Sequence, residues 1–203
     1  MTTRLTLAIA ASLGLAMTAC KPSDAPTGTD ASTTAPADAA QSDNPFFAQS
    51  ALTLGYPQFD RIKDDHFGPA FDAGMAEELK EVDAIANLAD APTFDNTIIA
   101  LEKSGKTLGN ARRVFANLNG TDTNDARKKI NNDYAPRFAA HRDAIMLNPK
   151  LFARVDAIFQ QRTQLNLDPE SLRLVERYHT SFVRAGAQLS EQQKIRLKQI
   201  NEE

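Results

Sequence analysis

The chain has 203 residues, of which 42% are hydrophobic and 24% are charged, and its formal net charge is -3. This composition is typical of a globular protein and excludes a wholly disordered chain. The slight acidic balance argues against a nucleic-acid-binding protein, so no nucleic acid is expected as a partner. A single cysteine excludes an internal disulfide framework and any multi-cysteine metal site.

The first twenty residues indicate an export signal. Arg4 supplies a positive charge, and the mostly apolar run from Leu5 to Ala16 leads through small residues to Cys20. This run is shorter than the roughly 20 apolar residues of a spanning helix, so we interpret residues 1–19 as a cleaved signal peptide. Met17-Thr18-Ala19-Cys20 resembles a bacterial lipobox, in which the cysteine is lipidated; an ordinary cleavage site beside an unrelated cysteine is the alternative.

An acylated Cys20 would anchor the protein to a membrane of the bacterial cell envelope, facing the periplasm. Residues 20–45 then form a linker, because the stretch from Lys21 to Pro45 contains no Val, Ile, Leu, Met or aromatic residue. Such a segment cannot bury enough apolar surface to offset the loss of chain entropy. The sequence therefore predicts a lipid anchor followed by a disordered tether.

Residues 46–203 show the apolar periodicity of amphipathic helices, and no stretch alternates long enough to require a strand. Six helix starts carry capping residues or an early proline. These starts are Gly68-Pro69, Thr93, Thr123 or Asn124, Asn148-Pro149, Asp168-Pro169, and Ser190 with Gln193. The predicted fold class is an all-α array of about six largely antiparallel helices with short connections.

Several details of these helices are specific expectations. Leu79 lies on the apolar stripe of the first helix. Residues 93–120 are predicted as one helix, with Gly105 and Gly109 inside it, serving either flexibility or the close packing of another helix. Asn119-Gly120 is expected to end that helix, and Pro136 is expected to kink the next one.

No catalytic, cofactor-binding or metal-binding residue is predicted in this chain. The histidines, His66, His141 and His179, are too far apart in sequence to pair on one helix face, so polar-face or capping roles are expected. Ser104-Gly105-Lys106-Thr107 looks like the end of a phosphate loop but lacks the upstream glycines and the strand. The adjacent acids Glu77-Glu78 and Asp64-Asp65 are interpreted as solvated surface or loop charge.

A series of separated blocks in one order carries a resemblance to a known family. The blocks are Asn44–Phe47, Asp65–Phe67, Pro69–Phe71, Ala91–Ile98, Glu102–Gly105, Leu147–Phe152, Leu165–Ser171, Leu174–Tyr178 and Phe182–Ala187. From Asn44 to Glu203 the chain resembles the N-terminal region of the thimet-oligopeptidase-like zinc metallopeptidases, in the peptidyl-dipeptidase (dipeptidyl carboxypeptidase) branch.

The resemblance implies a helical, two-halved zinc peptidase that releases dipeptides from the C-termini of short peptides. In the family, zinc is bound by His-Glu-x-x-His and a downstream glutamate, and the motif's glutamate acts as the general base. Those residues lie beyond the matched region, so none is carried onto this sequence. The zinc belongs to the full-length parent, and the fragment is expected to be inactive.

The final predicted helix, from Ser190, has no stop signal before Glu203. We therefore expect residues 46–203 to be the N-terminal piece of a longer enzyme, truncated at the C-terminus. The alternative is a complete small helical envelope lipoprotein that binds peptides or a protein partner.

Overall fold

The computed structural model describes residues 43–202. The chain divides into a unit spanning Met1–Thr34 and a unit spanning Ala35–Glu203, and all described residues belong to the second. The predicted signal peptide, Cys20 and nearly all of the predicted tether lie outside the described residues. The expectations about them remain predictions.

The structure of residues 43–202 is built from helices, with no strand among them, which confirms the all-α prediction. Short 3-10 turns come first: η1 (Pro45–Phe47), η2 (Thr53–Gly55) and η3 (Asp64–His66). The longer elements are α2 (Phe67–Ala86), the π-helical η4 (Phe94–Ile99), α3 (Ala100–Lys103), α4 (Lys106–Thr121), α5 (Asp125–Met146), α6 (Pro149–Gln161), α7 (Pro169–Arg184) and α8 (Glu191–Glu202).

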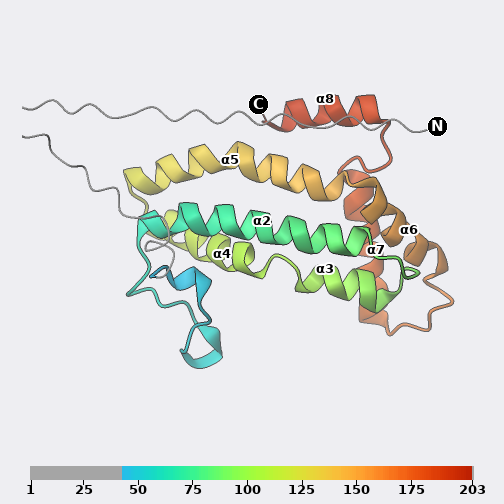
Figure 1. Cartoon of the computed structure of the whole chain (residues 1–203), viewed down its shortest axis with the longest axis horizontal. Helices are drawn as coiled ribbons and strands as arrows, with labels where there is room; N and C mark the ends of the chain where they lie inside the picture. Colours follow the sequence, from blue (N-terminus) through green and yellow to red (C-terminus); the bar gives the residue numbers. More distant parts are fainter. Residues whose placement is uncertain (1–42, 203) are drawn as a thin grey trace, which may run out of the picture. The chain divides into compact units, whose positions relative to one another are not determined.

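Helix α2 is central to this arrangement and packs against α4, α5 and α6 (Figure 1). Helix α5 runs beside α2 and also packs against α8, whereas α6 and α7 pack together near the C-terminal end of α2. No helix in residues 43–202 combines the length and the apolar character needed to cross a bilayer.

Most helix starts occur where local capping chemistry predicts them. Asn124 accepts a hydrogen bond from the Arg127 backbone N–H, and Asn148 accepts from two N–H groups at the start of α6. Asp168 caps α7 in the same way, and Ser190 and Gln193 form the reciprocal pair of a capping box. These contacts satisfy N–H groups that have no partner within their own helix.

Two hydrophobic cores hold the helices together. The aromatic core gathers side chains from α2, α4 and the first half of α5, and its buried members are Phe67, Ala70, Phe71, Met75, Leu108, Ala111, Val114 and Phe115. The aliphatic core lies between the C-terminal half of α2, η4, α3, α6 and α7. Its buried members are Val82, Ile85, Ala86, Ile98, Leu101, Leu151, Val155, Ile158, Val175, Phe182 and Ala187.

The prediction of a single helix over residues 93–120 is wrong, because the chain breaks between α3 and α4. Gly105 adopts φ +65°, and a Cβ atom there would lie 2.5 Å from the Glu78 carboxyl carbon. The Gly105 N–H donates to the Glu81 carboxylate of α2 at 2.8 Å, which holds the break in place. Gly105 therefore provides both a left-handed conformation and close packing.

The structure also bears on three smaller expectations. Helix α4 continues through Gly120 to Thr121, and Asp122 rather than Gly120 follows the helix. Helix α5 extends through Pro136 without interruption. Leu79 is 37% exposed, so its expected place in the core is wrong. At that level of α2 the neighbouring Glu78 takes the inward position, toward His141 and Gly105.

Candidate functional site

The segment 45–58 and the first part of α4 line an open cavity of about 800 Å³. We call it the α4 cavity. Its lining comprises Pro45, Phe46, Phe47, Ala48, Gln49, Ser50, Leu54, Gly55, Tyr56, Pro57, Gln58, Ile62, Lys106, Thr107, Asn110, Arg113 and Val114. This lining contains two cationic side chains and no carboxylate.

Polar and aromatic contacts attach the start of this segment to the body. Asn44 is 3% exposed, and its side-chain amide donates to the His66 carbonyl at 2.8 Å while its oxygen accepts from the Phe46 N–H. The Phe46 ring then packs against Phe67, with centroids 5.3 Å apart. The cavity wall is therefore anchored to the first turn of α2.

A tight turn shapes the outer part of the segment. The Ser50 hydroxyl accepts from the Leu52 N–H at 3.2 Å and donates to the Tyr56 carbonyl at 2.5 Å. Leu54 has φ +57°, a conformation that is uncommon for residues other than glycine, and its side chain is 92% exposed. Tyr56 is 63% exposed, so the turn presents apolar surface to solvent at the cavity's edge.

The opposite wall of the α4 cavity is polar and positively charged. Lys106, Asn110 and Arg113 follow one another at helical spacing along one face of α4. Arg113 donates to the Asn110 side-chain oxygen at 2.5 Å. Within residues 43–202 neither Lys106 nor Arg113 forms an ion pair with a carboxylate. Both charges are available to an anionic ligand.

A second cavity, of about 440 Å³, adjoins a histidine–carboxylate pair between α2 and α5. His141 is 8% exposed, and its Nε2 lies 2.8 Å from Glu78 Oε2. Its Nδ1 is buried and has no hydrogen-bond partner among the described atoms. The interpretation of Glu78 as solvated charge is wrong, because a histidine 63 residues away in sequence contacts it.

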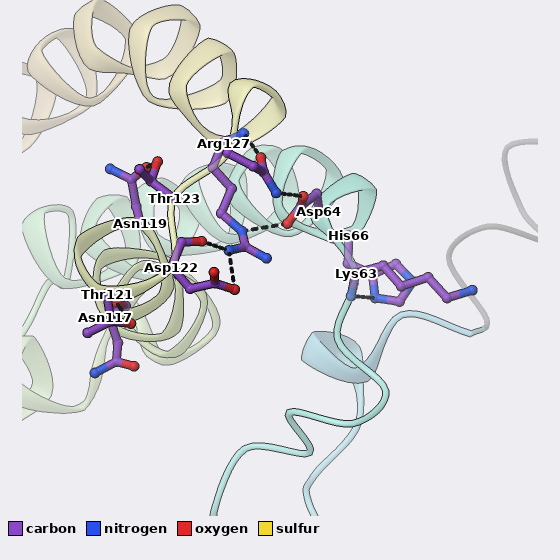
Figure 2. Close-up of polar contacts among 10 residues, drawn as sticks. Lys63, Asp64, His66, Asn117, Asn119, Thr121, Asp122, Thr123 and Arg127 are labelled. Atoms are coloured by element: carbon purple, nitrogen blue, oxygen red, sulfur yellow. Dashed lines mark hydrogen bonds and ion pairs between the residues drawn. The ribbon is translucent and has the colours of Figure 1, made fainter.

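Asp64 is likewise a structural contact rather than a free surface charge. Figure 2 shows Arg127, from the first turn of α5, reaching toward Asp64 in η3 and Asp122 after α4. Asp64 accepts from Arg127 Nε at 2.7 Å and from the Asn124 amide at 2.7 Å. Burial alone would raise the pKa of Asp64, but these hydrogen bonds and the Arg127 charge outweigh burial and lower it.

The histidines occupy separate structural positions. His66 Nδ1 accepts from the Lys63 N–H at 3.1 Å and caps η3. His179 contacts Asp156 at 3.1 Å and stacks on the Phe159 ring, with centroids 3.8 Å apart. In the described range, no three histidine, cysteine or acidic side chains converge as a metal-binding group would require.

The chain is similar to two curated peptidases. It is 48% identical over 162 residues to the dipeptidyl carboxypeptidase of Salmonella typhimurium and 44% identical over 160 residues to that of Escherichia coli. The matches cover 80% and 79% of this chain but only 24% of each relative, so the chain spans about a quarter of their length. No protein-family model matches. The two similarities support a relationship to peptidyl-dipeptidases.

Proposed function

We propose that this chain is the N-terminal region of a peptidyl-dipeptidase that releases dipeptides from the C-termini of short peptides. The observation that carries the proposal is the 44–48% identity to two dipeptidyl carboxypeptidases over about four fifths of the chain. In this proposal, residues 46–203 supply one helical wall of a substrate channel. The hydrolytic zinc, which would activate a water molecule, is held by residues of the longer protein.

The distribution of polar groups supports a wall rather than a hydrolytic centre. Glu78 and His141 join α2 to α5, Asp64 joins η3 to α5, and His179 pairs with Asp156 between α7 and α6. Each of these groups is engaged in holding helices together. We therefore assign the described residues to substrate positioning and to the support of the channel.

The proposal includes placement in the cell envelope. The lipobox-like Met17-Thr18-Ala19-Cys20 supports acylation of Cys20, and residues 21–45 would then space the helical body from the membrane. Metabolic labelling with a radioactive fatty acid in a bacterial host tests this part. Incorporation that is lost in Cys20→Ser is expected, and equal labelling of both proteins would contradict it.

A chimeric enzyme tests the peptidase assignment. Residues 43–203 replace the matched quarter of the Salmonella typhimurium relative, and release of C-terminal dipeptides from a blocked tripeptide is measured with zinc present. Activity is expected in the chimera, whereas the 203-residue chain alone should release no dipeptide. A soluble, zinc-loaded chimera without activity would contradict the assignment. Reading the gene past Glu203 for an in-frame His-Glu-x-x-His gives an independent check.

The α4 cavity favours a second candidate, a helical envelope lipoprotein that binds peptides without hydrolysing them. The cavity's two cationic side chains have no ion pair within residues 43–202, and its apolar side chains are exposed, so it needs no hydrolytic partner to bind a ligand. A stop codon directly after Glu203, together with peptide binding by the chain alone, would favour this candidate over the peptidase.

A further inference from the structure

We propose that the α4 cavity binds short peptides through a carboxylate, with a neighbouring apolar side chain of the peptide against Tyr56 and Leu54. The choice of a peptide as the ligand rests on the proposed function. The carboxylate can be the C-terminus or an acidic side chain, because both present the same group to the cavity.

The first argument for this proposal is the positive charge of the α4 cavity. Lys106 and Arg113 lie seven residues apart, two turns along one face of α4, with Asn110 between them. No carboxylate lines the cavity to neutralise them, and neither is ion-paired within residues 43–202. A guanidinium group binds a carboxylate with matched geometry, and an ammonium group adds a flexible charge. An anionic group is the complementary ligand.

The second argument is the exposed apolar surface of the turn that contains Leu54 and Tyr56. Leu54 has φ +57° and lies in a turn in which the Gly55 N–H donates to the Leu52 carbonyl at 2.9 Å. The Ser50 hydroxyl closes the turn, because it accepts from the Leu52 N–H and donates to the Tyr56 carbonyl. A leucine in this conformation is strained, and such strain often accompanies binding sites. The turn also leaves Leu54 92% exposed and Tyr56 63% exposed. An apolar ligand group would cover both side chains.

The remaining lining suits a peptide better than a simple organic acid. The amide side chains of Gln49 and Gln58 also line the cavity, and the Gln58 oxygen accepts a hydrogen bond from Arg61. Amide groups both donate and accept, so they can bond to peptide N–H and C=O groups. A volume of about 800 Å³ accommodates several residues of an extended peptide.

Fluorescence anisotropy on the full 203-residue chain tests the inference, with Cys20→Ser included to exclude acylation. The probes are dansyl-Gly-Gly-Phe with a free C-terminus, its C-terminal amide, and dansyl-Gly-Asp-Phe-amide. We expect both carboxylate-bearing probes to bind about tenfold more tightly than the neutral amide, with the difference shrinking at high salt.

Two sets of variants locate the site. Lys106→Gln with Arg113→Gln should weaken binding of the free acid about tenfold and abolish the preference over the amide. The control, Arg112→Gln with Lys128→Gln, removes two exposed cations outside the cavity and should leave binding unchanged.

The variant Leu54→Asn tests the apolar contact, because asparagine tolerates positive φ. It should weaken binding of the phenylalanine probes more than binding of the same probes with alanine in place of phenylalanine.

Several outcomes would overturn the inference. These are equal binding of the acid and amide probes, equal loss in the control variant, or binding only to phosphatidylglycerol vesicles, which would indicate a membrane-facing surface. An active chimera whose peptide binding ignores Lys106 and Arg113 would leave the peptidase assignment standing and remove this site. An inactive chimera, together with the expected binding pattern in the 203-residue chain, would remove the peptidase assignment and leave this binding site standing.

Discussion

The aromatic core and the aliphatic core differ in what they hold together. In the aromatic core the Phe71 ring lies 5.0–5.4 Å from three other rings in edge-on contacts, which join α2 to α4 and α5. The aliphatic core packs branched side chains of α6 and α7 against the end of α2 and η4. Both cavities adjoin the aromatic region, so the region built from rings also carries the candidate binding surface.

Polar contacts follow the same division. Between the α2 side and α5, the acids Asp64, Asp72 and Glu78 face Arg127, Arg137 and His141, at distances of 2.7–2.8 Å. In the aliphatic region a single buried side chain, Arg154, donates to the Leu88 and Asp90 carbonyls and to the side chains of Asn96 and Thr97. The aromatic region is thus joined mainly by ion pairs between α2 and α5. In the aliphatic region a buried arginine binds a loop, and His179 pairs with Asp156 between α7 and α6.

The largest expected effect comes from truncating the centre of the aromatic core. Phe71 is fully buried, so Phe71→Ala should lower the free energy of unfolding by about 3–5 kcal/mol. Leu151→Ala, in the fully buried centre of the aliphatic core, should cost about 2–5 kcal/mol. Urea denaturation measures both. Limited proteolysis within residues 45–58 should increase only in Phe71→Ala, and equal cleavage in both variants would contradict the separation of the cores.

A methyl group tests how closely α2 and α4 approach. A Cβ atom on Gly74 would lie 2.7 Å from the Leu108 backbone nitrogen, so Gly74→Ala should destabilise the protein by about 1–3 kcal/mol by forcing α4 away. Gly120→Ala is the matched control, because nothing lies within 4 Å of its Cβ position. It should stabilise α4 by up to about 1 kcal/mol. Thermal melts that rank the two variants in the opposite order would refute the close contact.

The smallest effect concerns the joint at Asp64. The pKa of Asp64 is lowered in the folded protein, so the ionised carboxylate stabilises the fold above its unfolded pKa of about 4. That contribution is lost as the pH falls through the lower folded pKa. Asp64→Asn should therefore be less stable than the unmodified chain near neutral pH, by about 1 kcal/mol. The gap should close in acid.

Melting temperatures measured from neutral pH to below about 4 check this dependence. Asp60→Asn, which removes an exposed carboxylate with no ion pair among the described residues, provides the comparison. A stability gap for Asp64→Asn that persists unchanged into acid would show that the carboxylate's charge does not act at this joint.

The sequence alone determined the all-α class and most helix starts, because a cap such as Asn148 or Asp168 bonds to residues two or three positions further along. It also carried the resemblance to peptidyl-dipeptidases. Only the tertiary structure decided the break at Gly105, the roles of Glu78 and Asp64, and the α4 cavity. Each of these depends on side chains that are distant in sequence, from 24 residues for Gly105 and Glu81 to 63 for Glu78 and His141. Periodicity and capping patterns report only local spacing, so they do not register such contacts.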